Sequence, residues 1–284
     1  MSQSQQPQDD RTILFADRVF ARFSVASNTY CIPVDEVLLS AWQEEEIRLD
    51  QLNRIVRSVL NDHVVLPEAH FPPDDDEVPA VLDCGFGKGA WIDDLLEEYE
   101  SDDCEVTGVD LYLGDGTDDE DDDEDSDDEE RRAVQEFVKK RWNLNETFSA
   151  DRNPDRLTPE SFDLINSRLL AAGIDRDRWP SYIRDLKRLL KPGGWLQMVE
   201  LELLFQSDSG RLSLNDDQPL RLWTSWHDDT MLRNNRDTRV GRKLRQYLLD
   251  AGFEDIVHRQ ESLCVGGWNP SEHDIVTNRQ LDAD

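Results

Sequence analysis

The stretch VLDCGFGKG, residues 81–89, decides the fold class of this 284-residue chain. A short apolar run contains an acid and leads into three glycines at alternate positions, Gly85, Gly87 and Gly89, and a helical pattern opens after them. Glycine has no Cβ, so a turn built from it accepts positive φ and lets its backbone approach a ligand closely. The stretch therefore predicts a strand, a nucleotide-type cofactor loop and a helix.

Two cofactor classes match this loop formally. Dinucleotide enzymes use G-x-G-x-x-G/A, which Gly85, Gly87 and Ala90 satisfy. With Asp83 ahead of the first glycine and Gly89 after the second, the loop also reads D-x-G-x-G-x-G and resembles class I methyltransferases. The resemblance implies S-adenosylmethionine as the cofactor. It implies that Asp83 positions the amino end and that the glycines lie against the methionine and ribose part.

A second acid ends the next apolar run. Residues 106–110 read VTGVD and predict a second strand that ends in Asp110. An ionised carboxylate can accept two hydrogen bonds at once, and the resemblance implies that Asp110 holds both ribose hydroxyls, with Leu111 beside the cofactor. The alternative is that Asp110 merely ends a strand.

The later motifs favour the methyltransferase interpretation over the nicotinamide one. Residues 161–166 (SFDLIN) predict a fourth strand, and the helical spacing over 182–191 ends at a Pro-Gly-Gly turn before the apolar run 195–200. Proline cannot continue a helix, and glycine accommodates the turn into the next strand. This succession is typical of class I methyltransferases.

The third strand is expected over residues 146–150. By the same resemblance, Asp151 and Arg152 just beyond that strand contact the adenine of the cofactor. A simple turn acid is the alternative for Asp151.

The chain is strongly acidic, with 31 basic against 63 acidic residues and a formal charge of −32. DNA and anionic membranes are therefore poor partners, because phosphate binding gains from a cationic surface and from released counterions. Residues 118–130 hold twelve of the acids, and the surrounding run 114–132 cannot supply a buried face. We expect a disordered surface insertion there, with binding of a basic partner or a metal as the alternative.

The other compositional signals indicate a cytoplasmic protein without a metal centre. The four cysteines show no C-x-x-C spacing, so neither a zinc site nor a disulfide framework is expected. Residues 1–11 are polar and are expected to form a disordered tail without a signal sequence. No run approaches the length of a membrane span. A nuclear location belongs to the regulatory alternative given below.

A further pairing precedes the glycine loop. Residues 30–36 (YCIPVDE) and 46–50 (EIRLD) resemble the Y-x-L-P-x-D-E…E-x-x-R-L-D lead-in of the fungal LaeA-like methyltransferases, and the resemblance spans residues 28–258. It implies that residues 12–75 form a helical cover over a methyltransferase domain at 76–284. Tyr30 and Arg48 are then lid residues, although Tyr30 can equally be an interface aromatic.

The chain departs from the family pattern at three places. Gln51-Leu52-Asn53 follows R-L-D where members commonly carry glutamine and histidine, and Asn166 replaces a histidine after F-D-L-I. A histidine base is therefore not carried over from the family. Residues 265–268 (VGGW) lack the proline of the P-x-G-x-W pattern, so a different acceptor pocket is expected.

Candidate acceptor contacts lie in LWTSWHDD, residues 222–229. Trp223 and Trp226 stand three apart and share a helix face, which predicts an apolar wall for a planar or polyene acceptor, with core packing as the alternative. His227 is the candidate general base. Arg168 is a candidate bidentate contact to an acidic acceptor, with an ordinary surface arginine as the alternative.

These motifs predict an α/β, doubly wound, Rossmann-like class I methyltransferase fold. Its sheet is mostly parallel, with a helical N-terminal cover and a C-terminal antiparallel hairpin after a helix that ends near Gly252. The expected activity is S-adenosylmethionine-dependent O-methylation of a carboxylate or hydroxyl of a fungal secondary metabolite, a polyketide or a related small molecule. One alternative is a LaeA-type nuclear regulator that acts with velvet-family partners, and another is a degenerate fold used as a binding subunit.

Overall fold

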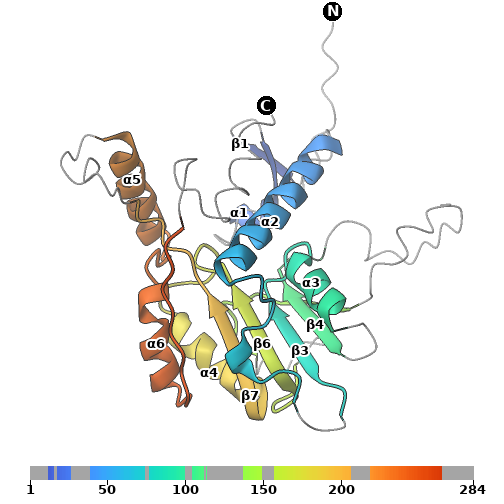
Figure 1. The fold of residues 1–284 in the computed structure, drawn as a ribbon. Helices are drawn as coiled ribbons and strands as arrows, with labels where there is room; N and C mark the ends of the chain where they lie inside the picture. Colours follow the sequence, from blue (N-terminus) through green and yellow to red (C-terminus); the bar gives the residue numbers. More distant parts are fainter. Residues whose placement is uncertain are drawn as a thin grey trace, which may run out of the picture.

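The computed structural model describes residues 12–15, 18–26, 39–73, 77–99, 104–111, 113, 137–148, 157–205 and 218–263. In this part of the chain a parallel sheet of five strands forms the centre, in the order β5-β4-β3-β6-β7 (Figure 1). The strands are β3 (Ala80–Cys84), β4 (Glu105–Asp110), β5 (Val138–Arg141), β6 (Phe162–Arg168) and β7 (Leu190–Val199). The chain order reverses between β3 and β6, and ligands of open α/β sheets bind at the carboxyl end of such a point.

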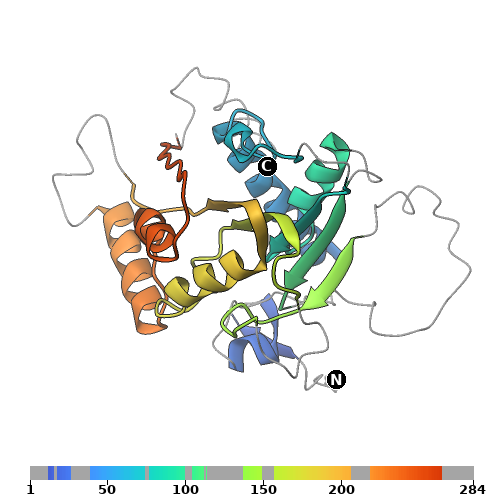
Figure 2. The ribbon, with the colours of Figure 1, turned by 90° about the horizontal axis from the view of Figure 1, so that it is seen from below.

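Helices cover both faces of the sheet (Figure 2). The helices are α1 (Arg22–Ala26), α2 (Leu39–Val59), α3 (Ala90–Glu98), α4 (Trp179–Leu189), α5 (Pro219–Arg233) and α6 (Gly241–Asp250), with a 3-10 turn at Pro67–Ala69. One core lies between the sheet and α4 and α6, and the other lies between the sheet and α3 with residues 64–69. The fold prediction of a doubly wound Rossmann-like domain is confirmed.

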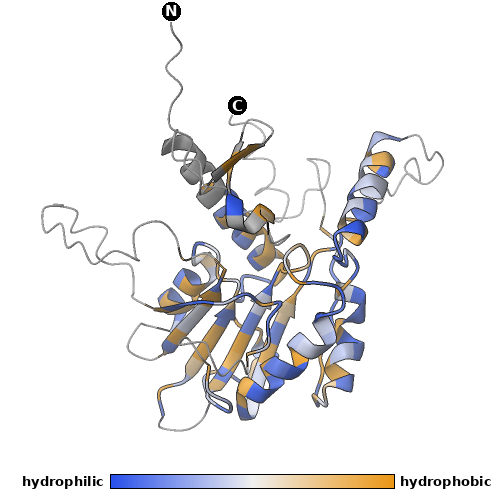
Figure 3. Cartoon of the chain, turned by 180° about the vertical axis from the view of Figure 1, so that it is seen from behind, coloured by the Kyte–Doolittle hydropathy of each residue, from blue (hydrophilic) through white to orange (hydrophobic). Residues whose placement is uncertain are grey.

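Neighbouring residues of one strand supply the two cores. In β3, Val81 belongs to the core under α3 and Leu82 to the core under α4. Leu164 and Ile165 of β6 divide in the same way, and all four side chains are fully buried. Successive side chains of a strand point to opposite faces, so a strand that is covered on both faces reads as a continuous apolar run. Figure 3 shows this apolar centre and the more polar outer helices.

The third strand lies at 138–141, so the prediction of a strand over 146–150 is wrong for its described part. Residues 144–148 lie in turns, and Trp142 and Phe148 fill the core beside them, with ring centroids 5.4 Å apart. The sequence of β5 is Val-Lys-Lys-Arg, and most of these side chains are exposed. An edge strand needs no apolar pattern, and charged side chains protect its unpaired edge. For this reason the apolar pattern of the sequence did not predict β5.

The N-terminal segment is only partly helical. Helix α2 is the helical part, whereas β1 (Thr12–Phe15) and β2 (Arg18–Ala21) form an antiparallel pair ahead of α1. The prediction of a helical cover over 12–75 therefore missed the strand pair at residues 12–21. The alternation of β-branched and aromatic residues in TILF and RVFA favours strands there.

Three predicted segments fall mainly beyond the described residues. The tail 1–11 and the insertion 114–132 lie outside them. Residues 254–263 contain no strand, and the rest of the predicted C-terminal hairpin also lies outside the described part. None of the helices that the structure describes is both long enough and apolar enough to cross a bilayer.

Candidate functional site

The glycine loop connects β3 to α3 at the carboxyl edge of the sheet. Gly85, Gly87 and Gly89 all have positive φ, at 74°, 59° and 93°. A Cβ added to Gly85 would stand 2.5 Å from Cδ2 of Leu170, so a larger residue here would strain the backbone and would also displace the end of that side chain. The predicted order of strand, glycine loop and helix is what the structure contains.

Asp110 meets this loop from the neighbouring strand. It ends β4, and its Oδ2 accepts a hydrogen bond from the backbone N–H of Gly87 at 2.9 Å. Two segments that are 23 residues apart in the chain are thereby joined into one edge. Leu111 follows Asp110 directly, and its contact with the cofactor stays a prediction.

Gly108 is a member of the site that sequence reasoning missed. A Cβ at this position would stand 2.7 Å from ring atoms of both Phe86 and Phe137. These two rings pack edge to face beside the loop, with centroids 5.3 Å apart. The signal was available, because an isolated glycine inside a strand often marks a close approach.

Asp83 is buried in β3, two residues before Gly85. Its Oδ1 accepts a hydrogen bond from Nδ2 of Asn166 at 2.8 Å. Burial raises the pKa of Asp83 to about 6, although the charge of Arg168 and the bond from Asn166 act in the opposite direction. Asp110 contributes a smaller rise. The carboxyl group therefore titrates closer to neutrality than an ordinary aspartate.

These residues fit S-adenosylmethionine, the cofactor that the loop predicted. The three left-handed glycines carry no side chains of their own, so the backbone of the loop can approach a ligand closely. Asp83 and Asp110 place two carboxyl groups next to this backbone, which suits a ligand with an amino group and ribose hydroxyls and disfavours the pyrophosphate of a dinucleotide.

Helix α2 reaches over the loop from the N-terminal part of the chain. Cδ1 of Leu49 would lie 3.6 Å from a Cβ on Gly87. Asn53 of the same helix donates to the carbonyl of Ala90 at 3.1 Å and to Oδ2 of Asp94 at 2.6 Å. The helix that the family resemblance identified as a cover is thus bonded directly to α3. Arg48 lies exposed on this helix.

Arg168 also belongs to this attachment. Its Nη2 donates to Oδ1 of Asn53 at 2.8 Å, and its guanidinium lies 5.8 Å from the ring of Trp91. Burial lowers the pKa of the Arg168 guanidinium, while Asp83 and then Asp94 oppose that change. Arg57 forms an ion pair with Asp94 at 2.7 Å and completes the group. Arg168 is therefore not an ordinary surface arginine, and its predicted contact with an acceptor stays a prediction.

Glu200 is a second, half-buried acid at this edge that the sequence did not single out. It follows β7 directly, and its two carboxylate oxygens accept the backbone N–H groups of Leu170 and Ala171 at 2.9 and 3.0 Å. Burial raises the pKa of Glu200 to about 8, against the effect of these two bonds. The acid fixes the loop whose Leu170 side chain lies against Gly85.

The other predicted acceptor residues, Trp223, Trp226 and His227, lie on α5, which has no buried residue. Trp223 is 44% exposed and Trp226 is 66% exposed, so core packing does not explain either side chain. Trp223 stacks on His227 with centroids 5.1 Å apart and meets Phe205 edge to face at 5.9 Å. Nδ1 of His227 lies 3.7 Å from Oδ1 of Asp228 and has no hydrogen-bond partner among the described residues.

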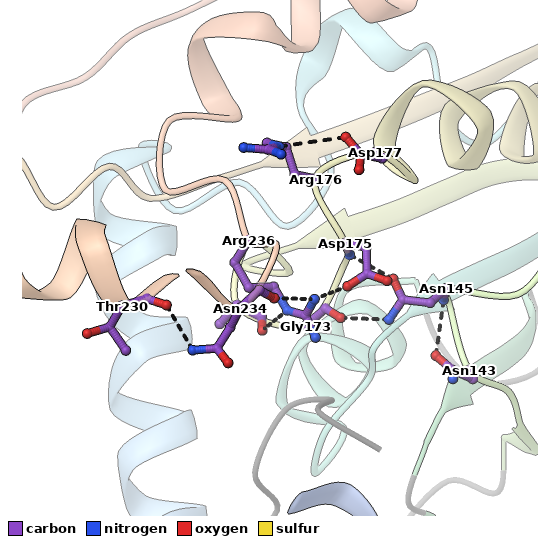
Figure 4. Close-up of polar contacts among 10 residues, drawn as sticks. Asn143, Asn145, Gly173, Asp175, Arg176, Asp177, Thr230, Asn234 and Arg236 are labelled. Atoms are coloured by element: carbon purple, nitrogen blue, oxygen red, sulfur yellow. Dashed lines mark hydrogen bonds and ion pairs between the residues drawn. The ribbon is translucent and has the colours of Figure 1, made fainter. Parts of the chain in front are cut away.

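A polar cluster attaches the end of α5 to the rest of the domain (Figure 4). Arg236 is buried, donates to the carbonyl of Ala172 at 2.9 Å and forms an ion pair with Asp175. Asn145 holds the same loop, because its Nδ2 donates to the carbonyl of Gly173 at 2.9 Å and its Oδ1 accepts from the N–H of Asp175 at 2.7 Å. Polar contacts, rather than an apolar interface, hold this end of the helix.

The predicted adenine contacts and one lid residue cannot be placed. Tyr30, Asp151 and Arg152 lie outside the described residues. Because the third strand ends at Arg141, the positions just beyond it are Trp142 and Asn143, and the N–H of Trp142 donates to the carbonyl of Asp110 at 2.8 Å. Asn143 is therefore a polar residue near the cofactor edge that the misplaced strand concealed.

Comparisons with known proteins agree with this geometry. A family model described as "Methyltransferase domain" matches residues 57–258. The "Secondary metabolism regulator LAE1" of Cochliobolus heterostrophus is 28% identical over 213 residues, which are 74% of this chain and 61% of that protein. The "Methyltransferase pytC" of Aspergillus terreus is 25% identical over 226 residues, which are 80% of this chain and 60% of that protein.

The matches thus span about three fifths of the length of these relatives. The family model covers the whole of the parallel sheet, from β3 to β7, together with α3 to α6. The Asp83 loop and Asp110, which the sequence identified first, lie inside the matched residues. The chain belongs to the methyltransferase-domain family and is of the LaeA-like class within it.

Proposed function

We propose that this protein is an S-adenosylmethionine-dependent methyltransferase that O-methylates a carboxylate or hydroxyl of a fungal secondary metabolite. The observation that carries the proposal is the glycine loop bonded to Asp110 above the buried Asp83. The methyltransferase-domain match and the likeness to pytC support the same activity. A cytoplasmic location and a diffusible acceptor agree with the acidic composition.

The cofactor supplies a methyl group activated by a sulfonium. In this proposal Asp83 holds the amino end, and Asp110 accepts hydrogen bonds from the ribose hydroxyls in addition to the N–H of Gly87. Helix α2 excludes water through Leu49, and its bonds to α3 keep it in position. Alignment of the acceptor behind the methyl group can supply most of the rate enhancement of such a displacement.

The acceptor is proposed to lie against α5. The exposed rings of Trp223 and Trp226 provide an apolar wall, and His227 stacked on Trp223 is a candidate base for a hydroxyl acceptor. A carboxylate acceptor would need no base. Arg168 can attract such an acid electrostatically while it remains bonded to Asn53.

A second candidate function is a nuclear regulator that acts with velvet-family proteins. The similarity to the secondary metabolism regulator LAE1 favours it. The two functions differ in what the protein must bind, since a regulator requires a protein partner and an enzyme requires a small-molecule acceptor. Co-purification of partners from a fungal extract discriminates between them.

The first test is calorimetric titration with S-adenosylmethionine and S-adenosylhomocysteine, with NAD and NADP as controls. Micromolar binding of the sulfur cofactors alone supports the proposal. A gene-deletion strain should then lack one methylated metabolite and accumulate its unmethylated precursor. Binding of NAD instead, or a deletion strain with unchanged metabolites, would count against the enzyme and leave the regulator or a degenerate fold.

A further inference from the structure

Three buried polar side chains form a row across the middle of the sheet. Asp83, Asn166 and Gln197 are paired in register on β3, β6 and β7, and 5% or less of each is exposed. Side chains in register on neighbouring strands point to the same face. Asn166 Nδ2 donates to Asp83 Oδ1 at 2.8 Å, and Gln197 Nε2 lies 3.2 Å from Asn166 Oδ1. A row of polar groups in a buried sheet is costly unless each group is bonded.

The backbone of residues 64–66 fixes the donor-to-acceptor direction of the hydrogen bonds in this row. Gln197 donates from Nε2 to the carbonyl of Val64 at 3.0 Å and accepts at Oε1 from the N–H of Leu66 at 2.9 Å. A carbonyl can only accept and a backbone N–H can only donate, so the amide of Gln197 has one orientation that satisfies both.

The orientation of the Gln197 amide fixes the orientation of the Asn166 amide, and through it the hydrogen bond to Asp83. Nε2 of Gln197 has a second hydrogen, which points at Asn166 and requires an acceptor there. Oδ1 of Asn166 is that acceptor, so its Nδ2 must face Asp83 as a donor. Oδ1 of Asp83 therefore receives a hydrogen bond in a fixed direction, and such a bond favours the ionised carboxyl group.

The charged groups around Asp83 do not fix its orientation in this way. Arg168 of β6 favours the ionised form by charge, but its Nη2 donates to Asn53 of α2. Asp94 of α3 and Arg57 of α2 face Arg168, and Asp110 of β4 disfavours the ionised form. The thiol of Cys84, with a pKa raised by burial, stays neutral. Among these described groups, the amide of Asn166 is the one that donates a hydrogen bond to the Asp83 carboxyl group.

We propose that Asn166 and Gln197 are positioning residues, which hold the Asp83 carboxylate ionised and in one orientation for the amino group of the cofactor. The inference rests on the proposed function, because it concerns the ligand that Asp83 holds. It gives a role to the asparagine that this chain carries where the family pattern has a histidine. At this position the side chain faces a buried carboxyl group. A neutral amide always carries N–H groups, so it can donate a hydrogen bond there without first being protonated.

The test compares two ligands by calorimetry between pH 5 and pH 9. One is S-adenosylhomocysteine, and the other is its analogue in which hydrogen replaces the α-amino group. Asn166→Leu should weaken binding of the first roughly ten- to hundredfold at pH 7 and leave the second nearly unchanged, because one charge-assisted contact is lost. Without the donor, Asp83 takes up its proton more readily, so the acid limb of the first binding curve moves to higher pH.

Gln197→Met tests the direction of the row, since it leaves Asn166 in place and removes the group that orients it. It should move the acid limb of the S-adenosylhomocysteine binding curve to higher pH, but by less than Asn166→Leu does. It also supplies both readouts if Asn166→Leu fails to fold. Ser167→Ala is the matched control, because Ser167 is the adjacent buried residue of β6 and its hydroxyl lies 3.1 Å from that of Tyr182 on the other side. It should leave both the ligand preference and the pH curve unchanged.

The outcomes separate the two proposals. If the wild-type chain binds neither ligand, the proposed function and this inference both fail. If the wild type binds both but shows no preference for the amino group, or if both variants keep that preference and the same pH curve, the positioning role alone fails. A lost preference in the variants, with binding of the deamino analogue retained, supports it.

Discussion

The two halves of the carboxyl edge are built in different ways. On the cofactor half, Asp83 and Asn166 are buried, and the glycine loop is bonded to the neighbouring strand. On the half to which we assign the acceptor, α5 contributes no buried residue and presents two exposed tryptophans. A charged, hydrogen-bonded ligand needs preorganised partners, because unpaired buried groups are costly. An apolar acceptor needs only an exposed apolar surface, so the residues of α5 can change without destabilising the hydrophobic core.

Gly85→Ala should break the cofactor half most severely. The new Cβ would meet Leu170 at 2.5 Å in a backbone with φ of 74°. We expect a loss of about 2–5 kcal/mol in the free energy of unfolding, from left-handed strain and overpacking together. Urea unfolding measures it. Gly193→Ala is the control with a similar φ of 84° but nothing within 4 Å, and it should cost about 1–2 kcal/mol from strain alone. Equal losses would show that the contact with Leu170 has no effect.

Asp110→Ala should act on the ligand more than on the fold. It removes the acceptor of the Gly87 N–H and the proposed ribose contacts, and we expect cofactor binding to weaken by about 1.5–3 kcal/mol. Calorimetry with S-adenosylhomocysteine measures this. Asp163→Ala serves as the control, because Asp163 binds Lys191 and the N–H of Ala80 at the opposite end of the sheet. That variant should lose stability and keep its affinity, and unchanged affinity in a folded Asp110→Ala would exclude the assigned role.

Asn53→Leu should loosen the cover. Asn53 bonds Arg168, Asp94 and the carbonyl of Ala90, and its loss leaves these groups short of partners. We expect unfolding to become easier by about 1–3 kcal/mol and α2 to exchange its amide hydrogens faster. Hydrogen exchange by mass spectrometry resolves the helix from the sheet. Gln246→Leu is the control, since Gln246 is exposed and donates a hydrogen bond to Asp250 of its own helix. Uniform acceleration over the whole chain would mean that Asn53 stabilises the domain and not the cover.

Glu200→Gln should change how stability depends on pH. Burial raises the pKa of Glu200 from 4.5 to about 8, so the folded chain binds this proton more tightly than the unfolded chain does. Stability from this group is therefore complete below pH 4.5 and is lost as the pH rises towards 8. Urea unfolding at pH 5 and pH 8.5 should show a smaller decline in the variant than in the wild type. An equal decline would assign the pH dependence to other groups.

Trp226→Ala should have the smallest effect on the fold. The side chain is 66% exposed, so we expect a change within about 0.5 kcal/mol in unfolding and none in cofactor affinity. Trp91, which is buried under the cover, is the contrast, and its replacement by alanine should cost about 3–5 kcal/mol. Once an acceptor is known, its KM should rise in Trp226→Ala. An unchanged KM would remove Trp226 from the acceptor wall.

The site was predictable where a residue type is required by local conformation. Gly85, Gly87 and Gly89 have positive φ, which few other residues adopt, so the pattern of glycines identified the loop without any tertiary information. Asp110 was predictable because parallel strands bring their carboxyl ends to one edge. The third strand was not, since β5 at the sheet edge carries charged side chains and lacks an apolar pattern.

The sequence by itself determined the fold class, the cofactor loop and the two acids beside it, because backbone conformation and strand burial act on residues close together in the chain. Only the tertiary structure decided which partner each polar side chain hydrogen-bonds. The sequence presented Asn166 as a missing histidine and Asn53 only as part of a departure from the family pattern, and Gln197 carried no signal. Their roles depend on partners 31 to 133 residues away, and only the register of the strands and the position of α2 bring those partners within hydrogen-bond distance.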